Sequence, residues 1–188
     1  MINAIPAADG SIACQVRSLF YPFSNRPSHS QCSNRAFYGY LCVDHAKKYY
    51  HVEVKRSLLP DAGLGLFATQ RIYESTPICP YLGPIVSSEE FDHEPSAYGL
   101  EAVNGEIINP IHPWDCFARF ANNLRLRDPA ATGGTCGINN CYFLSEYDIG
   151  SIFHSFIGSR RNVWLVAKRD IDRGEELYAD YIDAEQEY

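Results

Sequence analysis

From His51 onward, short apolar runs alternate with clusters of Gly, Pro, Asn and Asp, a pattern typical of many short strands joined by turns. The stretch EAVNGEIINP predicts a hairpin, because Asn-Gly favours a two-residue turn. SSEEFDHE predicts a short helix with Ser87 or Ser88 as its N-cap, and residues 115–124 predict one or two helical turns. The remaining runs predict strands over residues 51–59, 64–72, 77–87, 140–144 and 162–171, and a turn followed by a short strand over 172–181.

The sequence contains no long amphipathic helix and no internal repeat. The main domain is therefore predicted to be mostly β, in the α+β class, and to begin near residue 51. Residues 1–50 are rich in Ser, Asn, Pro, Tyr and Cys and show little periodic hydrophobicity. The chain has 188 residues, which is enough for one domain with its own core and such a small appendage.

The appendage contains QCSNRAFYGYLCVDH, which brings Cys32, Cys42 and His45 close together in sequence. With Cys14 as a fourth ligand, these residues predict a tetrahedral Cys3His zinc site. Four protein ligands leave no open position, so the zinc is expected to be structural and to stabilise a segment with few apolar residues. The alternatives are that His29 or His51 replaces Cys14, or that the cysteines are unconnected.

Composition and charge exclude several classes of protein. Hydrophobic residues make up 46% of the chain and charged residues 21%, which is typical of a globular protein rather than a disordered one. No apolar run is long enough to cross a bilayer, and the amino terminus lacks a secretory signal pattern, so an intracellular protein is expected. The net charge of −7 argues against direct nucleic-acid binding; it suits a basic partner, or it simply maintains solubility.

Three further phrases carry candidate chemistry: AGLGLFAT at 62–69, FARFANN followed by INNC, and VAKRDIDRGEELYADY at 166–181. Each phrase alone is weak, since G-x-G is usually a turn and GEEL usually leads into a strand. The adjacent Asn122 and Asn123 follow an apolar stretch and need hydrogen-bond partners, because a buried unpaired carboxamide costs about 1–3 kcal/mol. They either end a structural element or hold a polar ligand.

In their order and separation, these phrases resemble the SET-domain protein lysine methyltransferases over about residues 51–183. The family's G-x-G-L-F-A, Y-x-G, R-F-x-N-H, P-N and A-x-R-D-I-x-x-G-E-E-L-x-x-D-Y appear as GLGLFA, YLG at 81–83, RFANN, NN at 139–140 and AKRDIDRGEELYADY. The resemblance implies a SET-type fold of several short curved sheets, with a knot-like C-terminal segment that lies beside RFANN. It divides the chain into a zinc-binding segment (1–50), a SET domain (51–183) and a tail (184–188).

The resemblance also implies a cofactor, S-adenosyl-L-methionine, and the residues that hold it. Leu64, Gly65 and Leu66 would offer main-chain groups at close approach, because glycine has no Cβ. The Asn122 side chain and the Asn123 backbone would bind the cofactor, the latter at the adenine edge. Tyr98 matches a family tyrosine near the cofactor.

The second substrate would be a lysine, and its proton is the chemical obstacle. An amine with an ordinary pKa of about 10.4 is charged at neutral pH, and neutralising it costs roughly 4 kcal/mol. A desolvating channel and the adjacent sulfonium both lower that pKa. Tyr181 matches the family's catalytic tyrosine and would orient the amine and the methyl group. Tyr81 either lines the same channel or packs in the core.

The sequence departs from the family pattern in several places. Asn123 stands where a histidine is usual, and residues 124–138 and 144–161 are insertions, expected as a surface loop and an extended hairpin. Ala179 stands where relatives often carry Phe or Tyr, although Tyr178 could fill the space, so the number of methyl groups transferred is left open. The cysteine trio that often follows is missing; Tyr188 or the acidic tail would close the channel, and Cys136 and Cys141 are expected to be free thiols.

The predicted function is S-adenosylmethionine-dependent methyl transfer to a lysine side chain of a basic protein or peptide such as a histone tail. The alternative is a catalytically weak SET-like scaffold that binds a basic peptide beside its zinc segment; a purely structural zinc protein is a weaker third reading. A nuclear location is expected rather than a cytoplasmic one, and no membrane partner. No clear basic localisation cluster supports this expectation.

Overall fold

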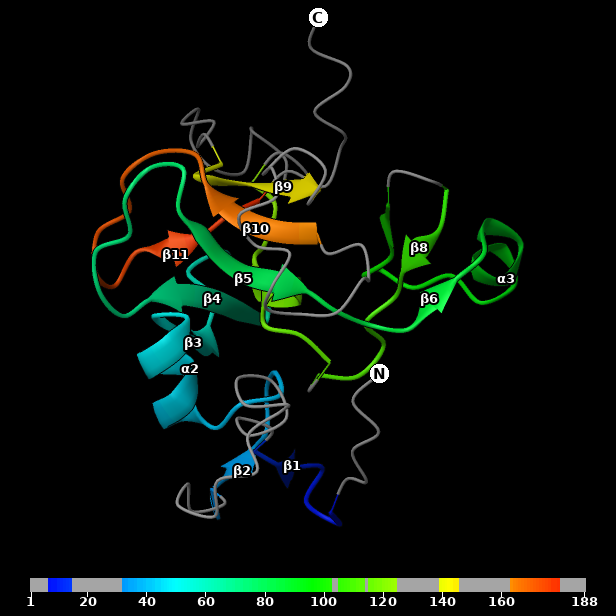
Figure 1. Ribbon diagram of the computed structural model, residues 1–188, viewed down its shortest axis with the longest axis horizontal. Coiled ribbons are helices and arrows are strands. Elements are labelled where there is room, and N and C mark those ends of the chain that lie inside the picture. Colours follow the sequence, from blue (N-terminus) through cyan, green and yellow to red (C-terminus); the bar gives the residue numbers. More distant parts are fainter. Residues whose placement is uncertain are drawn as a thin grey trace, which may run out of the picture.

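The computed structural model describes residues 7–14, 32–102, 105–113, 115–124, 139–145 and 163–179 (Figure 1). Two three-stranded sheets form the body and a third projects from it, while a two-stranded amino-terminal sheet and one helix lie at the lower edge in this view. The loop predicted over 124–138, most of the extended hairpin predicted over 144–161, and the tail 184–188 lie outside the described residues.

The amino-terminal segment has more regular structure than the sequence predicted. Strand β1 (Ile12–Ala13) pairs antiparallel with β2 (Arg35–Ala36), and helix α2 (Val43–Tyr49) follows. No helix was predicted for this segment. Only Ala46 of α2 is buried, so the helix is short and lacks the repeating apolar stripe that makes a helix recognisable in a sequence.

The sheet next to this segment has the order β11-β4-β3, with all neighbours antiparallel. It consists of β3 (Val52–Arg56), β4 (Leu64–Ala68) and β11 (Glu176–Leu177). The central strand β4 is almost wholly buried, which explains its continuous apolar sequence. This sheet joins the GLGLFA phrase to the GEEL phrase, with Leu66 opposite Leu177.

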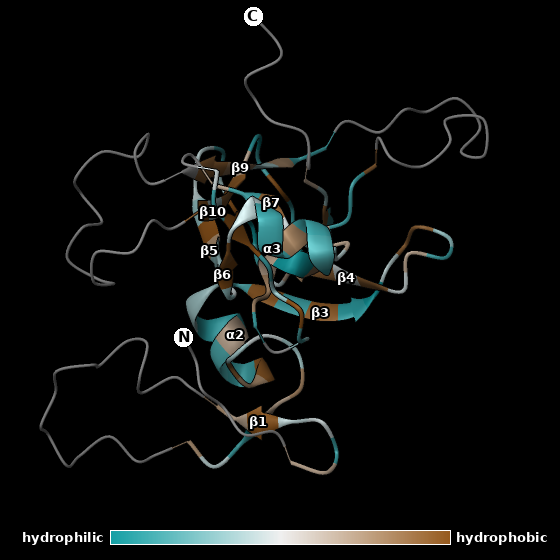
Figure 2. Cartoon of the chain, turned by 90° about the vertical axis from the view of Figure 1, so that its right-hand side faces the viewer, coloured by the Kyte–Doolittle hydropathy of each residue, from teal (hydrophilic) through white to brown (hydrophobic). Residues whose placement is uncertain are grey.

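A second antiparallel sheet has the order β5-β10-β9. It contains β5 (Pro77–Tyr81), β10 (Val163–Ala167) and β9 (Cys141–Ser145). All three strands were predicted from their apolar runs, and their mainly hydrophobic character is visible in Figure 2. Leu165 in the centre is fully buried.

A third, smaller sheet projects from the body with the order β6-β8-β7. It contains β6 (Ile85–Val86), β8 (Ile107–Ile108) and β7 (Leu100–Glu101), and it carries helix α3 (Ser88–His93). The helix begins with the predicted N-cap Ser87, which forms a capping box with Glu90. The single strand predicted over 77–87 is two strands separated by residues 82–84, and within this break a Cβ on Gly83 would lie 2.7 Å from the Pro110 nitrogen.

The described core is one continuous cluster that includes residues from both the amino-terminal segment and the sheets. Between them lies the 3-10 helix η1 (Ala118–Phe120), where the sequence predicted one or two helical turns within 115–124. After η1 the chain forms a parallel bridge between Asn122 and Tyr178, and Cys141 forms another with Ala179. The RFANN phrase and the end of the chain's last described strand therefore lie side by side, as the family resemblance implied.

Candidate functional site

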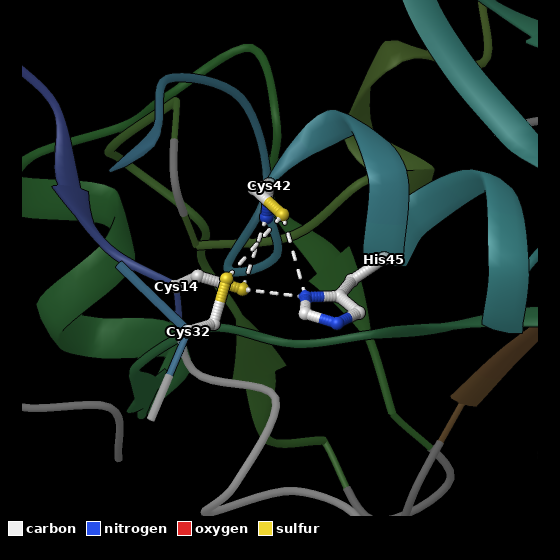
Figure 3. Close-up of side chains that lie close together, drawn as sticks. All are labelled: Cys14, Cys32, Cys42 and His45. Atoms are coloured by element: carbon white, nitrogen blue, oxygen red, sulfur yellow. Dashed lines mark hydrogen bonds between the residues drawn. The ribbon is translucent and has the colours of Figure 1, made fainter. Parts of the chain in front are cut away.

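The four predicted metal ligands lie together at the start of helix α2 (Figure 3). Cys14 follows β1, Cys42 is the N-cap of α2, and His45 lies in its first turn. The ligand atoms of these residues and of Cys32 all lie within 4.8 Å of one another. The antiparallel pairing of β1 with β2 brings Cys14 to the other three residues across a long stretch of sequence.

The distances within this cluster suit a zinc ion. Bonds of about 2.3 Å to sulfur and about 2.0 Å to nitrogen place tetrahedral ligand atoms about 3.5–3.8 Å apart. The His45 Nδ1 atom lies 3.3 Å from the Sγ atoms of both Cys14 and Cys42, and the Cys32 and Cys42 sulfurs are 3.9 Å apart. His51, one alternative ligand, instead points its Nδ1 at the Lys47 carbonyl oxygen, and His29 lies outside the described residues.

The phrases predicted to bind the cofactor meet around the carboxamide of Asn122. Its Nδ2 donates to the Leu64 carbonyl at 3.0 Å and to Glu176 Oε1 at 3.1 Å. A third contact, at 3.3 Å, goes to the Ser57 hydroxyl oxygen. Because a carbonyl and a carboxylate can only accept, the amide orientation is fixed, and among the described residues Oδ1 has no protein donor. Asn122 therefore presents a free acceptor beside β4.

Glu176 holds this arrangement together, although the sequence analysis did not single it out. It is buried, and its carboxylate accepts four hydrogen bonds, from three side chains and one backbone N–H. The donors are the Ser57 hydroxyl at 2.6 Å, the Leu58 N–H at 2.7 Å, Asn122 Nδ2 at 3.1 Å and the Tyr178 hydroxyl at 2.8 Å. Burial and the neighbouring Glu176 raise the pKa of Tyr178, so this phenol remains a donor.

Gly65 was predicted to let the cofactor approach the main chain, and that contact stays a prediction; in the structure it is the Glu176 carboxylate that approaches this glycine. A Cβ on Gly65 would lie 2.1 Å from Glu176 Oε1 and 2.8 Å from its Cδ. The neighbouring Leu66 is fully buried, while Leu64 is half-buried and offers its carbonyl to Asn122. Position 65 therefore needs glycine to admit the carboxylate that orients Asn122.

The second asparagine pair in the sequence secures the same region. Asn139 accepts from the Leu124 N–H at 3.0 Å and donates to Asn123 Oδ1 at 3.2 Å. Asn140 donates to the Glu176 carbonyl at 2.8 Å and accepts from the Tyr178 N–H at 2.8 Å. The Oδ1 atom of the buried Asn123 side chain is thus engaged within the protein, and a cofactor contact of the Asn123 backbone stays a prediction.

A buried cation lies at Tyr98, another predicted cofactor residue. The Arg119 guanidinium lies 3.8 Å from the centroid of the Tyr98 ring, and Arg119 is only 7% exposed. Among the described residues, its Nε and Nη1 atoms have no hydrogen-bond partner. A buried guanidinium with two unused donors is suited to an anionic ligand. Arg119 is the first residue of the RFANN motif, but it was not among the predicted site residues.

Of the two tyrosines predicted to be catalytic, Tyr81 lies among the described residues and Tyr181 does not. Tyr81 is buried, its hydroxyl donates to the Tyr98 carbonyl at 2.7 Å, and its ring packs edge-on against Phe143 at 5.2 Å. This position holds Tyr98 in place, and a further role at the lysine channel stays a prediction. Tyr181 lies outside the described residues, as does Cys136; Cys141 is a buried free thiol.

Ala179 lies at the point where the two phrases meet. It is fully buried, and its N–H donates to the Asn122 carbonyl at 2.9 Å. Tyr178, which the sequence offered as a ring to fill the space beside it, has its hydroxyl bound to Glu176. None of the helices in the described part of the chain is long and apolar enough to cross a membrane.

Comparison with known proteins identifies the family. The SET domain model matches residues 63–182, so the chain belongs to the SET-domain family of protein lysine methyltransferases that its phrases resemble. Among solved structures, it is similar to a chain described as ATXR5 in complex with histone H3.1 mono-methylated on R26, with a TM-score of 0.51 and 23% identity. The match covers 72% of this chain and 59% of that one, and it supports the SET fold. No curated protein matches the sequence significantly.

Proposed function

We propose that this protein transfers a methyl group from S-adenosylmethionine to the side-chain amine of a lysine in a basic protein, with a histone tail as the substrate. The observation that carries the proposal is the free Asn122 acceptor at the junction of β4, η1 and β11. Three segments that are far apart in sequence form the hydrogen bonds that fix this one carboxamide. The end of a structural element would not require so many.

The described residues of this site suit the amino acid end of the cofactor, which is zwitterionic. Asn122 Oδ1 would accept from its ammonium, and Arg119 would donate to its carboxylate. The β4 backbone around Gly65 and the backbone of Asn123 would bind the rest. When bound, the cofactor supplies an electrophilic methyl group on a sulfonium.

The protein's part in the reaction is to deliver a neutral amine in line with that methyl group. Removing water from the lysine lowers its pKa, because the charged form loses solvation. Alignment then lowers the remaining barrier without any strong base. Tyr181 is proposed to orient the amine, and the protonated Tyr178 is excluded as a base because burial and Glu176 raise its pKa.

A histone tail as substrate and a nuclear location are supported by charge and by family. The chain carries a net charge of −7, and residues 72–118 contain no Lys or Arg but eight Asp or Glu. Such a segment attracts a Lys/Arg-rich peptide. The structure of ATXR5 includes a histone, but the present chain spans 59% of that protein's length, so substrate identity rests on the assay below.

The test is transfer of radiolabelled methyl from S-adenosylmethionine to purified histones and to whole-cell lysate. Wild-type protein is expected to label a lysine-rich protein, and Tyr181→Phe to lose most of that activity. The matched control is Tyr73→Phe, since Tyr73 is 65% exposed and is not part of the proposed site. Peptide binding that survives Tyr181→Phe, with no labelling by either form, would instead support the peptide-binding scaffold.

A further inference from the structure

The strap, defined as residues 37–41, connects the amino-terminal segment to the proposed cofactor site. It lies between two of the clustered metal ligands, Cys32 and Cys42. The Gly39 N–H donates to the Pro113 carbonyl at 2.8 Å, and Gly39 has a φ of 62°. A Cβ at Gly39 would lie 2.4 Å from the Phe117 ring, so the strap backbone lies directly against that ring.

Aromatic contacts extend from the strap to both ends of η1. Tyr40 is fully buried, and its ring packs edge-on against Phe117 at 5.5 Å. Its hydroxyl donates to the Tyr50 hydroxyl at 2.9 Å, which ties the strap to the end of α2. Tyr38 packs edge-on against Phe120 at 5.6 Å and is 39% exposed.

From Phe120 the contacts continue to the buried cation. The Arg119 guanidinium lies 5.6 Å from the Phe120 ring centroid and 3.8 Å from that of Tyr98. The guanidinium therefore lies near both rings, and of those two Phe120 is the one that Tyr38 packs against. Because no described residue hydrogen-bonds Arg119 Nε or Nη1, packing rather than hydrogen bonding sets the guanidinium position.

We propose that Tyr38 is a positioning residue for cofactor binding, and that metal bound at the Cys/His cluster strengthens cofactor binding through the strap. The proposal rests on the proposed function, because it requires S-adenosylmethionine to use Arg119. Removing the metal releases Cys42, which directly follows the strap, and so frees Tyr38 to leave Phe120. Coupling of this kind is reciprocal, so the cofactor must tighten metal binding by the same factor.

The first experiment measures the dissociation constant of S-adenosylmethionine by titration calorimetry on the metal-loaded full chain. Tyr38→Leu is expected to weaken binding by about fivefold or more, while Tyr38→Phe keeps the ring and binds within about twofold of wild type. Phe37→Leu is the matched control: Phe37 is 50% exposed and adjacent in sequence, and it has no described ring contact. Zinc content and melting temperature of each variant separate positioning from misfolding.

The second experiment uses wild-type protein alone, so it stands even where Tyr38→Leu fails to fold. A zinc chelator competes for the metal with and without saturating S-adenosylmethionine, and the cofactor is expected to raise the apparent zinc affinity about fivefold or more. Wild-type protein that does not bind the cofactor overturns the proposed function. Protein that binds it, but with zinc affinity unchanged by the cofactor or with Tyr38→Leu equal to wild type, overturns only the role of the strap.

Discussion

Glu176 is a single side chain that sets the geometry of the proposed cofactor site through its contacts within the protein. Its carboxylate is buried and accepts four hydrogen bonds, and no described Lys or Arg pairs with it. Four donors compensate for the loss of water around the charge. The result is a fixed Asn122 carboxamide and a required glycine at position 65.

The change Glu176→Gln tests this role at constant size. The new amide has one acceptor oxygen and one NH2 group, so at least one N–H, from Leu58 or Asn122, would face another donor. We expect a loss of about 1–3 kcal/mol in the free energy of unfolding, together with weaker S-adenosylmethionine binding. Urea denaturation and calorimetry measure the two effects. Glu101→Gln, at an exposed position, is the control, and an equal effect of the two changes would refute the assignment.

Some residues of the candidate site could be selected from the sequence and others could not. The difference lies in how far away along the chain their contact partners are. Asn122, Gly65 and the Cys/His residues stand in short motifs, which became informative through their order and separation along the chain. Glu176 takes a hydrogen bond from Ser57, which is 119 positions away, and Arg119 gains meaning only from its stack on Tyr98 and its two unused donors. Such roles depend on tertiary contacts that no local pattern records.

Among the elements, the turn before β11 depends on an ionised acid. Glu175 accepts from Asn140 Nδ2 at 3.0 Å, from the Asp172 N–H at 3.1 Å and from the Arg169 guanidinium. Burial alone raises the pKa of Glu175, but these hydrogen bonds and the arginine charge outweigh it and bring the pKa below its ordinary value of 4.5. The carboxylate therefore stabilises the fold above that value and stops doing so as the pH falls through its folded pKa.

Glu175→Gln is accordingly expected to destabilise the protein at neutral pH and to matter progressively less in acid. The difference in unfolding free energy between wild type and variant should be largest near pH 7 and should shrink below about pH 4.5. Urea titrations at a series of pH values measure it. Glu89→Gln, on an exposed position of α3, controls for the loss of one negative charge. A difference that stays constant down to about pH 3 would contradict the assigned pKa shift.

The elements that the sequence predicted well are those whose burial follows a simple rule. Buried central strands such as β4 and β10 read as apolar runs, and α3 carries its capping box in its own sequence. Helix α2 was not predicted because it buries only one residue. Its position depends on the Cys/His cluster at its start and on packing against β3. The break between β5 and β6 lies where Gly83 approaches Pro110, which is far away in sequence.

At the scale of the whole molecule, the amino-terminal segment and the sheets share one core. Tyr40, Ala46 and Tyr50 belong to the same buried cluster as Phe117 and Leu66. We propose that the chain is divided into a zinc-binding segment (1–50), a SET domain (51–183) and a tail (184–188), according to where the family resemblance begins and ends. Unfolding, by contrast, is expected to be cooperative across the boundary, because a shared core has no interface to separate along.

Metal removal tests whether the amino-terminal segment (1–50) and the sheets unfold as one cooperative unit. With zinc bound, a single thermal transition is expected; chelation should move that whole transition to lower temperature, since binding to the native state adds to its stability. Cys14, Cys32 and Cys42 should then react rapidly with a thiol reagent. Cys79, Cys116 and Cys141 should stay slow until unfolding, because burial raises the pKa of each thiol, that of Cys116 to about 11. Calorimetry and timed thiol counting, with Cys32→Ser as a metal-deficient control, measure both effects. A sheet transition that chelation leaves in place would show that residues 1–50 fold independently, and that their metal is not required for the remainder of the protein.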